Sequence, residues 1–183
     1  MRTKQLVLTA LFAALTAIGA FLKIQIPVEG IPAITLQFFF TAMAGVLLGA
    51  KYGAISQAVY VLLGLVGLPI FTMGGGFSYV LQPSFGFLVG LIPSAWVIGM
   101  LCKNAKSFWP MALGILAGLA VLYLIGTPYM GLILNLYLGK GMSVWQIARA
   151  GCLIYLPGDL LKIAVCAPLC LTLRRRVRDL VPA

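Results

Sequence analysis

Long apolar runs, separated by short segments with polar residues, glycine or proline, dominate the pattern along this chain. A helix that crosses a bilayer needs about 20 mostly apolar residues. Six runs reach or approach that length, at 4–22, 35–49, 52–68, 85–102, 109–127 and 157–173. The second run is short unless its helix begins within the preceding segment. The pattern predicts an all-α integral membrane protein with about six transmembrane helices, in one domain over residues 1–183.

The segment 128–156 mixes apolar and polar residues. Its first part, 129–138, is a further apolar run that can extend the fifth helix, and Gly139-Lys140-Gly141 follows it. Ser143 is a residue type favoured at a helix N-cap, so it can begin a short helix over 144–155. The ends of the last two spans are therefore less well defined than the others.

The basic residues gather on one side of a six-helix arrangement, in which both termini share a side. That side carries Arg2, Lys4, Lys51, Lys103, Lys106, Arg174, Arg175, Arg176 and Arg178. The opposite side carries Lys23, Lys140 and Arg149, and Lys162 lies within the sixth run. Cytoplasmic loops hold the excess of Lys and Arg in membrane proteins. The distribution predicts that both termini are cytoplasmic, and five or seven helices would not separate the charges as cleanly.

The composition agrees with a membrane protein and argues against other classes. The 183 residues are 62% hydrophobic and 9% charged, whereas a soluble domain has about 25% charged residues. The net charge of +10 does not indicate nucleic-acid binding, because the basic residues flank apolar runs and form no single water-exposed patch.

The first run follows Arg2 and Lys4 as in a signal peptide. It is long for a signal's apolar core and no cleavage site follows, so we expect a retained helix.

Neither a metal site nor a nucleotide site is expected. The sequence has four Cys, no CxxC pair and no His, which leaves no ligand pattern for zinc. Cys166 and Cys170 share a helix face in an apolar run, and we expect them to pack there. The P-loop patterns GxxxxGKS and GxxxxGKT do not occur, so the chain has no recognisable means of using ATP.

Two segments on the side opposite the termini, 23–34 and 68–84, contain several Gly and Pro residues yet stay apolar. Irregular backbone near a membrane is tolerated where it is buried in protein or lines a cavity. The segments are predicted to be packed lids or walls over an outward-facing site; the alternative is ordinary tight turns. Gly74, Gly75 and Gly76 would permit a backbone turn or a close approach to a ligand.

The sequence has three acidic residues, Glu29, Asp159 and Asp179. Asp159 stands at the head of the sixth run, three residues before Lys162, so the two share a helix face, with Tyr155 one turn earlier. Ionisable residues within membrane spans are rare and usually functional. Asp159 and Lys162 are predicted to form an acceptor and donor pair aimed into a cavity, suited to a ligand with both N–H and C=O groups. The alternative is a structural ion pair that neutralises itself during insertion.

The first run carries two small-xxx-small patterns, Ala10 with Ala14 and Ala13 with Ala17. Small residues let two membrane helices approach closely. The alanines therefore predict either internal packing or a surface for a partner helix.

Four segments carry a resemblance to a known family. They are Pro32-Ala33-Ile34-Thr35-Leu36-Gln37, Gly64-Leu65-Val66-Gly67-Leu68-Pro69-Ile70-Phe71 with the glycines at 74–76, Gln82-Pro83-Ser84-Phe85-Gly86-Phe87-Leu88-Val89-Gly90, and Pro157-Gly158-Asp159-Leu160-Leu161-Lys162. In their order, spacing and hydropathy the chain resembles, over nearly its whole length, the BioY family of biotin-specific S components of energy-coupling-factor (ECF) transporters. The chain departs from the family at 82–87, where the family more often has Gly-Pro-Thr-Gly-Gly-Tyr.

The resemblance implies a six-helix protein of the prokaryotic plasma membrane that binds biotin from outside and uses no cofactor. It implies a transmembrane coupling protein and two cytoplasmic ATPases as partners, with Ala10, Ala13, Ala14 and Ala17 as the docking surface. Asp159 would accept N–H bonds from the ureido ring of biotin. Lys162 would donate to the ureido oxygen or pair with the tail carboxylate. Other contacts are expected from Thr35, Gln37, Tyr79, Gln82, Ser84, Phe71, Phe77, Tyr155, Gly74 and Gly75.

Three other functions compete with this interpretation. A stand-alone proton-coupled carrier would use Asp159 as its proton site. An S component for another vitamin would share the fold and the partners. An intramembrane enzyme is disfavoured, because the chain has no His and no paired carboxylates for acid–base chemistry, and we expect no catalytic residue.

Overall fold

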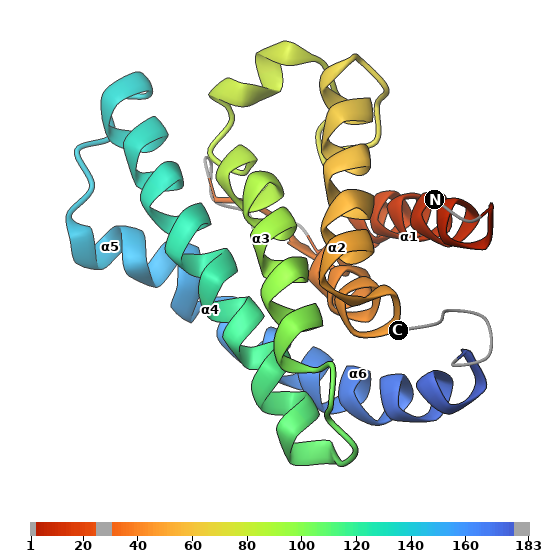
Figure 1. The fold of residues 1–183 in the computed structure, drawn as a ribbon. Helices are drawn as coiled ribbons and strands as arrows, with labels where there is room; N and C mark the ends of the chain where they lie inside the picture. Colours follow the sequence, from red (N-terminus) through yellow and green to blue (C-terminus); the bar gives the residue numbers. More distant parts are fainter. Residues whose placement is uncertain (1–2, 25–30, 178–183) are drawn as a thin grey trace.

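The computed structural model describes residues 3–24 and 31–177, with side chains up to Arg174. Its elements are α1 (Thr3–Phe21), β1 (Lys23–Ile24), β2 (Ile34–Thr35), α2 (Gln37–Leu65), the 3₁₀ helix η1 (Phe77–Leu81), α3 (Phe85–Leu101), α4 (Phe108–Leu132), the π-helix η2 (Ile133–Tyr137), α5 (Val144–Ala148), the π-helix η3 (Arg149–Leu153) and α6 (Leu156–Val177) (Figure 1). The strands form one short antiparallel pair that joins Lys23 to Thr35 and Ile24 to Ile34.

Most helices in the described residues have the length and composition of membrane spans. Four helical stretches are long and apolar enough to cross a bilayer: Thr3–Phe21, Gln37–Leu65, Phe108–Tyr137 and Val144–Arg174. Helix α3 is a shorter apolar helix of 17 residues. The prediction of an all-helical membrane protein is therefore confirmed.

Helix α2 is a hairpin of two antiparallel arms. Gly49 has φ 78° and ψ 176°, outside the helical region, in a conformation that L-residues with a side chain rarely adopt. The Thr41 hydroxyl donates to Gln57 Oε1 at 2.9 Å, and Gln37 Nε2 donates to the Tyr60 hydroxyl at 2.9 Å. In a straight helix, residues 16 apart would be about 24 Å apart. The arms correspond to the second and third predicted runs, with the reversal at the predicted boundary.

The segment between the fifth and sixth predicted runs is mostly helical. Helix α4 continues into η2 as far as Tyr137, so the fifth helix does extend through the second apolar run. The Ser143 hydroxyl accepts a hydrogen bond from the Gln146 amide, and the Gln146 side chain accepts one from the Ser143 amide. This capping box begins α5 as predicted, although the helix then passes into η3 before α6.

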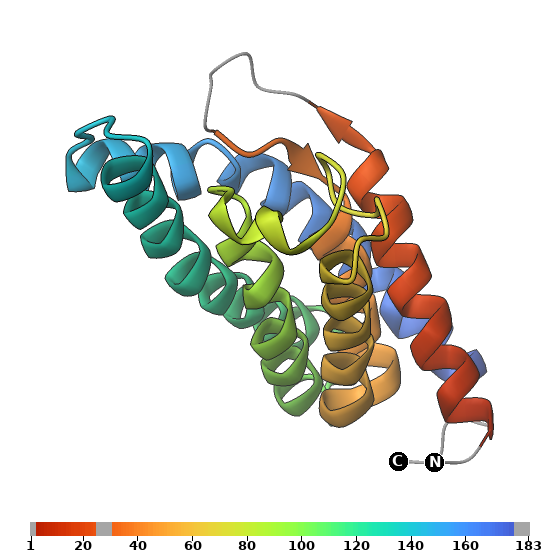
Figure 2. The same cartoon turned by 90° about the horizontal axis from the view of Figure 1, so that it is seen from above.

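The bundle has two different ends, which lie on opposite sides in Figure 2. The loop end comprises the β1–β2 pair and the segment 66–84. The clamped end comprises the reversal at Gly49, the turn 102–107 between α3 and α4, and the end of α6. There Arg174 donates to the carbonyl oxygens of Cys102 at 2.7 Å, Ala105 at 3.1 Å and Val46 at 3.0 Å. One side chain thereby ties α6 to both neighbouring helix ends.

The helices approach closely at the clamped end because glycines of one helix face the backbone of the neighbouring helix. A Cβ at Gly99 of α3 would lie 2.2 Å from the Ala50 nitrogen, and a Cβ at Gly45 would lie 2.6 Å from the Ala95 oxygen. Small residues at helix contacts are the usual means of tight packing in membranes. The same interior buries Thr41, Ser56, Gln57 and Tyr60 completely. Every buried side-chain nitrogen or oxygen in the described part of the chain has a hydrogen-bond partner.

Candidate functional site

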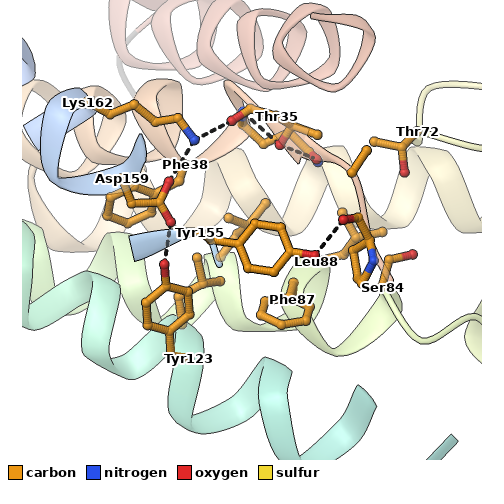
Figure 3. A pocket seen from close by; sticks show the side chains of 15 residues that line it. Thr35, Phe38, Thr72, Ser84, Phe87, Leu88, Tyr123, Tyr155, Asp159 and Lys162 are labelled. Atoms are coloured by element: carbon orange, nitrogen blue, oxygen red, sulfur yellow. Dashed lines mark hydrogen bonds and ion pairs between the residues drawn. The ribbon is translucent and has the colours of Figure 1, made fainter. Parts of the chain in front are cut away.

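A cavity lies below the loop end, between α2, α3, α4 and α6. Most of its wall is apolar, and its polar groups come from four separate parts of the chain. It is lined by Pro32, Ala33, Thr35, Gln37, Phe38, Thr72, Ser84, Phe87, Leu88, Leu91, Leu122, Tyr123, Tyr155, Asp159 and Lys162 (Figure 3). An apolar cavity with a few converging polar groups is the usual form of a small-molecule site.

The charged residues of the cavity come from the first two turns of α6. Lys162 Nζ lies 2.6 Å from Asp159 Oδ1 and also donates to the Thr35 carbonyl at 2.6 Å. The Asp159 amide donates to the Tyr155 carbonyl at 2.9 Å, so the helical turn continues through Pro157. Asp159 is 5% exposed. The predicted pair is formed, faces the cavity, and connects α6 to the strand β2.

Tyr123 of α4 is a member of this group that the sequence analysis missed. Its hydroxyl donates to Asp159 Oδ2 at 2.5 Å, so a protein donor binds each carboxylate oxygen. Figure 3 shows Asp159 between Lys162 and Tyr123. Tyr123 lies in an apolar run 36 residues before Asp159, and no spacing in the sequence connects the two. The one available signal was a hydroxyl group within a membrane span.

The strand β2 and the start of α2 contribute one neutral polar residue each, Thr35 and Gln37. The Thr35 hydroxyl donates to Gln37 Oε1 at 3.0 Å, and Gln37 Nε2 donates to the Tyr60 hydroxyl at 2.9 Å. On the opposite wall, the Tyr155 hydroxyl donates to the Pro32 carbonyl. Since Pro32 and Thr35 belong to the segment before α2, that segment is held against α6 and forms a wall of the cavity.

The segment 66–84 places only some of its predicted residues on the cavity. Thr72 and Ser84 line it. Tyr79 is 4% exposed and lies behind them: its hydroxyl accepts from Ser84 Oγ at 3.1 Å and lies 2.8 Å from Thr72 Oγ1. The polar wall of the cavity is therefore two residues deep at this point.

The aromatic residues and glycines of that segment lie elsewhere. Phe71 is 1% exposed and packs edge-on against Tyr60, with ring centroids 5.5 Å apart, whereas Phe77 is 79% exposed. Gly74 closes a tight turn by exchanging backbone hydrogen bonds with Phe71. Gly75 and Gln82 line a separate surface depression beside Tyr137. Of the predicted ligand contacts, the cavity thus brings together six: Thr35, Gln37, Ser84, Tyr155, Asp159 and Lys162. Glu29 and Asp179 lie outside the described residues.

The two alanine patterns of α1 point in different directions. Ala10 and Ala14 are exposed, whereas Ala13 is buried and Ala17 is half-buried against the core. The first pattern is therefore available to a partner helix, and the second contributes to internal packing.

Comparison with known proteins gives consistent results. A family model described as the BioY family matches residues 1–179. A relative from Lysinibacillus sphaericus, named "Probable biotin transporter BioY", is 46% identical over 151 residues, which are 81% of this chain and 76% of the relative. A relative from Thermotoga maritima, named "Biotin transporter BioY", is 38% identical over 174 residues, 94% of this chain and 96% of the relative.

A solved structure has the same arrangement of helices. It is the crystal structure of "the S-component for biotin from an ECF-type ABC transporter", with a TM-score of 0.82 and 27% sequence identity, covering 95% of this chain and 92% of that one.

Proposed function

Because this chain belongs to the BioY family, we propose that its cavity captures biotin between α2, α4 and α6. The chain is a biotin transporter of that family, the S component of an ECF-type ABC transporter, and not an enzyme. One observation carries the assignment of the site: the pair of buried Asp159 and half-buried Lys162, which faces the cavity with an acceptor and a donor side by side.

The chemistry of biotin matches these groups. Its ureido ring offers two N–H donors and one carbonyl acceptor, its thioether ring and chain are apolar, and its tail is a carboxylate. Asp159 accepts a ureido N–H, and Lys162 donates to the ureido oxygen or pairs with the tail carboxylate. A buried polar group left without a partner costs about 1–3 kcal/mol. The pair therefore discriminates against ligands that lack the matching groups.

The remaining wall suits the apolar part of biotin. Phe38, Leu88, Leu91 and Leu122 line the cavity from α2, α3 and α4, and Phe87 stacks near Tyr155 with ring centroids 6.4 Å apart. Thr35, Gln37 and Ser84 supply polar groups at the side of the loop end. Binding from that end follows, because the clamped end is closed by Arg174 and by helix contacts at glycine.

The topology we propose has six spans: α1, the two arms of α2, α3, α4 with η2, and α6, in one membrane domain over residues 1–183. Both termini would be cytoplasmic. The basic residues Lys4, Lys51, Lys103, Lys106 and Arg174 belong to the clamped end or to the start of α1 on the same side (Figure 2). Excess positive charge on that side supports a cytoplasmic position in a prokaryotic plasma membrane. Arg2 and Arg178, which contributed to the predicted charge difference, lie outside the described residues.

Energy for uptake would come from partner proteins. The connections at the clamped end are a reversal at Gly49 and the turn 102–107, and neither is long enough to fold into a nucleotide-binding domain. We infer that one transmembrane coupling protein and two cytoplasmic ATPases complete the transporter. The exposed Ala10 and Ala14 of α1 offer a surface on which a coupling helix can pack closely.

The purified chain tests the assignment directly. Mass spectrometry of its co-purified ligand, followed by isothermal titration of the ligand-free protein, should find biotin bound and should detect no binding or hydrolysis of ATP. Vesicles that contain this chain should accumulate biotin only when the ATPase partners are present. Concentrative uptake by the chain alone, dependent on a proton gradient, would favour the carrier hypothesis. Another vitamin in the mass spectrum would reassign the substrate.

A further inference from the structure

The Asp159 carboxylate is held from two sides by residues of different helices. Lys162, on the same helix, binds Oδ1 at 2.6 Å, and Tyr123, on α4, binds Oδ2 at 2.5 Å. A carboxylate oxygen can accept about two hydrogen bonds. One acceptor position therefore stays available on each oxygen for a ligand in the cavity.

The two hydrogen-bond partners of Asp159 differ in whether a ligand competes for them. Lys162 carries three donors on a flexible stem, and it already divides them between Asp159 and the Thr35 carbonyl. A ligand carbonyl or carboxylate that enters the cavity competes for the same ammonium group. Tyr123 has a rigid ring with one hydroxyl, and it approaches from α4, which is outside the segments of the loop end. If Lys162 donates to a ligand instead, the Tyr123 hydroxyl still has Asp159 Oδ2 as its acceptor.

Other tyrosine hydroxyls of this bundle serve a different purpose. Tyr60 donates to the Ile70 carbonyl at 3.1 Å, Tyr129 donates to the Val80 carbonyl at 2.6 Å, and Tyr155 donates to the Pro32 carbonyl. All three acceptors are backbone atoms of the segments before α2 and after it, so these hydroxyls hold the loop end in place. Tyr123 differs from them because its acceptor is a charged side chain in the cavity.

We propose that Tyr123 is a positioning residue, which fixes the Asp159 carboxylate so that its free acceptor positions meet the N–H groups of the ligand. The inference rests on the proposed function, and it adds a residue from α4 to the recognition of the ureido group. Leaving a buried carboxylate without its fixed donor is costly, since hydrogen bonds to charged groups are stronger than those between neutral groups.

The first test is Tyr123→Phe, which removes the hydroxyl and keeps the ring. Biotin affinity, measured by titration, should fall about 10- to 100-fold. Tyr129→Phe is the matched control on the same helix, and its effect should stay below about 3-fold. Equal affinity of Tyr123→Phe and the parent would overturn the inference while leaving biotin binding itself intact. Failure of the parent to bind biotin would instead reject the proposed function.

A double-mutant cycle separates positioning from general packing. In an Asp159→Asn background, Tyr123→Phe should cost less than about 3-fold in affinity, because the charged acceptor is already absent. A biotin derivative methylated on the ureido nitrogens should likewise bind both the parent and Tyr123→Phe with similar affinity. Full additivity in the cycle would mean that Tyr123 acts through packing, and it would refute the positioning role.

A spectroscopic measurement keeps the inference testable if Tyr123→Phe expresses poorly. The chain has two aspartates, Asp159 and Asp179, so labelling with ¹³C at the aspartate carboxyl gives two infrared bands, and Asp159→Asn assigns them. Replacing the tyrosines with 3-fluorotyrosine makes the phenolic hydroxyls stronger donors and leaves the Lys162 ammonium group unchanged, so the Asp159 band of the biotin-bound protein should shift, with the Asp179 band as the internal reference. An Asp159 band at the same position with and without fluorotyrosine would contradict the hydrogen bond on which the inference depends.

Discussion

The loop end and the clamped end of this bundle use half-buried cations in opposite ways. At the clamped end Arg174 donates hydrogen bonds to the backbone carbonyls of Val46, Cys102 and Ala105. At the loop end Lys162 divides its donors between one carbonyl and the Asp159 side chain. The first arrangement is complete without a ligand. The second can exchange a protein partner for a ligand group of the same kind.

The backbone also differs between the two ends: it is tightly packed helix at the clamped end and irregular at the loop end. At the clamped end, glycines bring helix backbones into direct contact, so no space remains for a side chain at Gly45 or Gly99. At the loop end, irregular segments are held by side-chain hydroxyls from Tyr60, Tyr129 and Tyr155 and by a few backbone hydrogen bonds, such as the one from the Gly76 amide to the Gly64 carbonyl at 2.7 Å. Local opening costs less free energy where few contacts hold a segment. Access for a ligand is therefore expected at the loop end.

The largest effect is expected from filling a glycine contact at the clamped end. In Gly99→Val the new Cβ would lie 2.2 Å from the Ala50 nitrogen and 2.5 Å from its Cα, and backbone atoms cannot move aside cheaply. Folded, monodisperse protein should be largely lost in size-exclusion chromatography. Gly158→Ala, at a helical position with no heavy atom within 4 Å of the added Cβ, should fold like the parent. Normal folding of Gly99→Val would show that the clamped end is less tightly closed than proposed.

The next largest effect concerns binding without a loss of folding. Asp159→Asn removes the charge partner of Lys162 and the acceptor for the ligand. Removing one member of a buried charge pair costs roughly 2–5 kcal/mol, so biotin affinity should fall at least about 30-fold, with the protein still inserted. The same substitution at Asp179 provides the control, and it should leave affinity unchanged. If Asp159→Asn binds as tightly as the parent, the pair is structural and the loop end is not the ligand site.

Local patterns in the sequence predicted the features of the fold that depend on neighbouring residues. The boundary between the runs 35–49 and 52–68, the Ser143 cap and the shared face of Asp159 and Lys162 were each predicted from a local pattern of residue types or spacing. Such features depend on helix geometry and on glycine conformation, which local sequence specifies.

Long-range partners could not be predicted in this way. Tyr123 reaches a carboxylate 36 positions away, and Arg174 reaches carbonyls at least 69 positions away. A backbone carbonyl has no sequence signature, because every residue carries one. Phe71 was expected to pack on the ligand, yet its ring fills the space over Gly64 in the core. An aromatic residue of the core and one on the cavity wall look alike in the sequence, because both lie in apolar segments.

A smaller effect on stability is expected at the clamped end. Arg174→Ala leaves three carbonyls without their charged donor, a loss of about 2 kcal/mol. The melting temperature in detergent should fall by roughly 4–8 °C, whereas biotin affinity should change less than about 2-fold because the cavity lies at the other end. Arg174→Lys should recover part of the stability. A large loss of affinity in Arg174→Ala would indicate that the two ends are coupled.

The smallest expected effect distinguishes two polar residues of the loop end, Ser84 on the cavity wall and Gln82 outside it. Ser84 lines the cavity and donates to Tyr79 at 3.1 Å, whereas Gln82 lines the separate surface depression beside Tyr137. A neutral hydrogen bond contributes about 0.5–1.5 kcal/mol, so Ser84→Ala should weaken biotin binding about 2- to 10-fold in isothermal titration. Gln82→Ala should stay within about 2-fold of the parent, because its side chain lies outside the cavity wall. The opposite order would place the tail of biotin in the surface depression and extend the binding site to Gln82. Lys162 would then bind the ureido oxygen of biotin, because the tail carboxylate would lie too far from the first turns of α6.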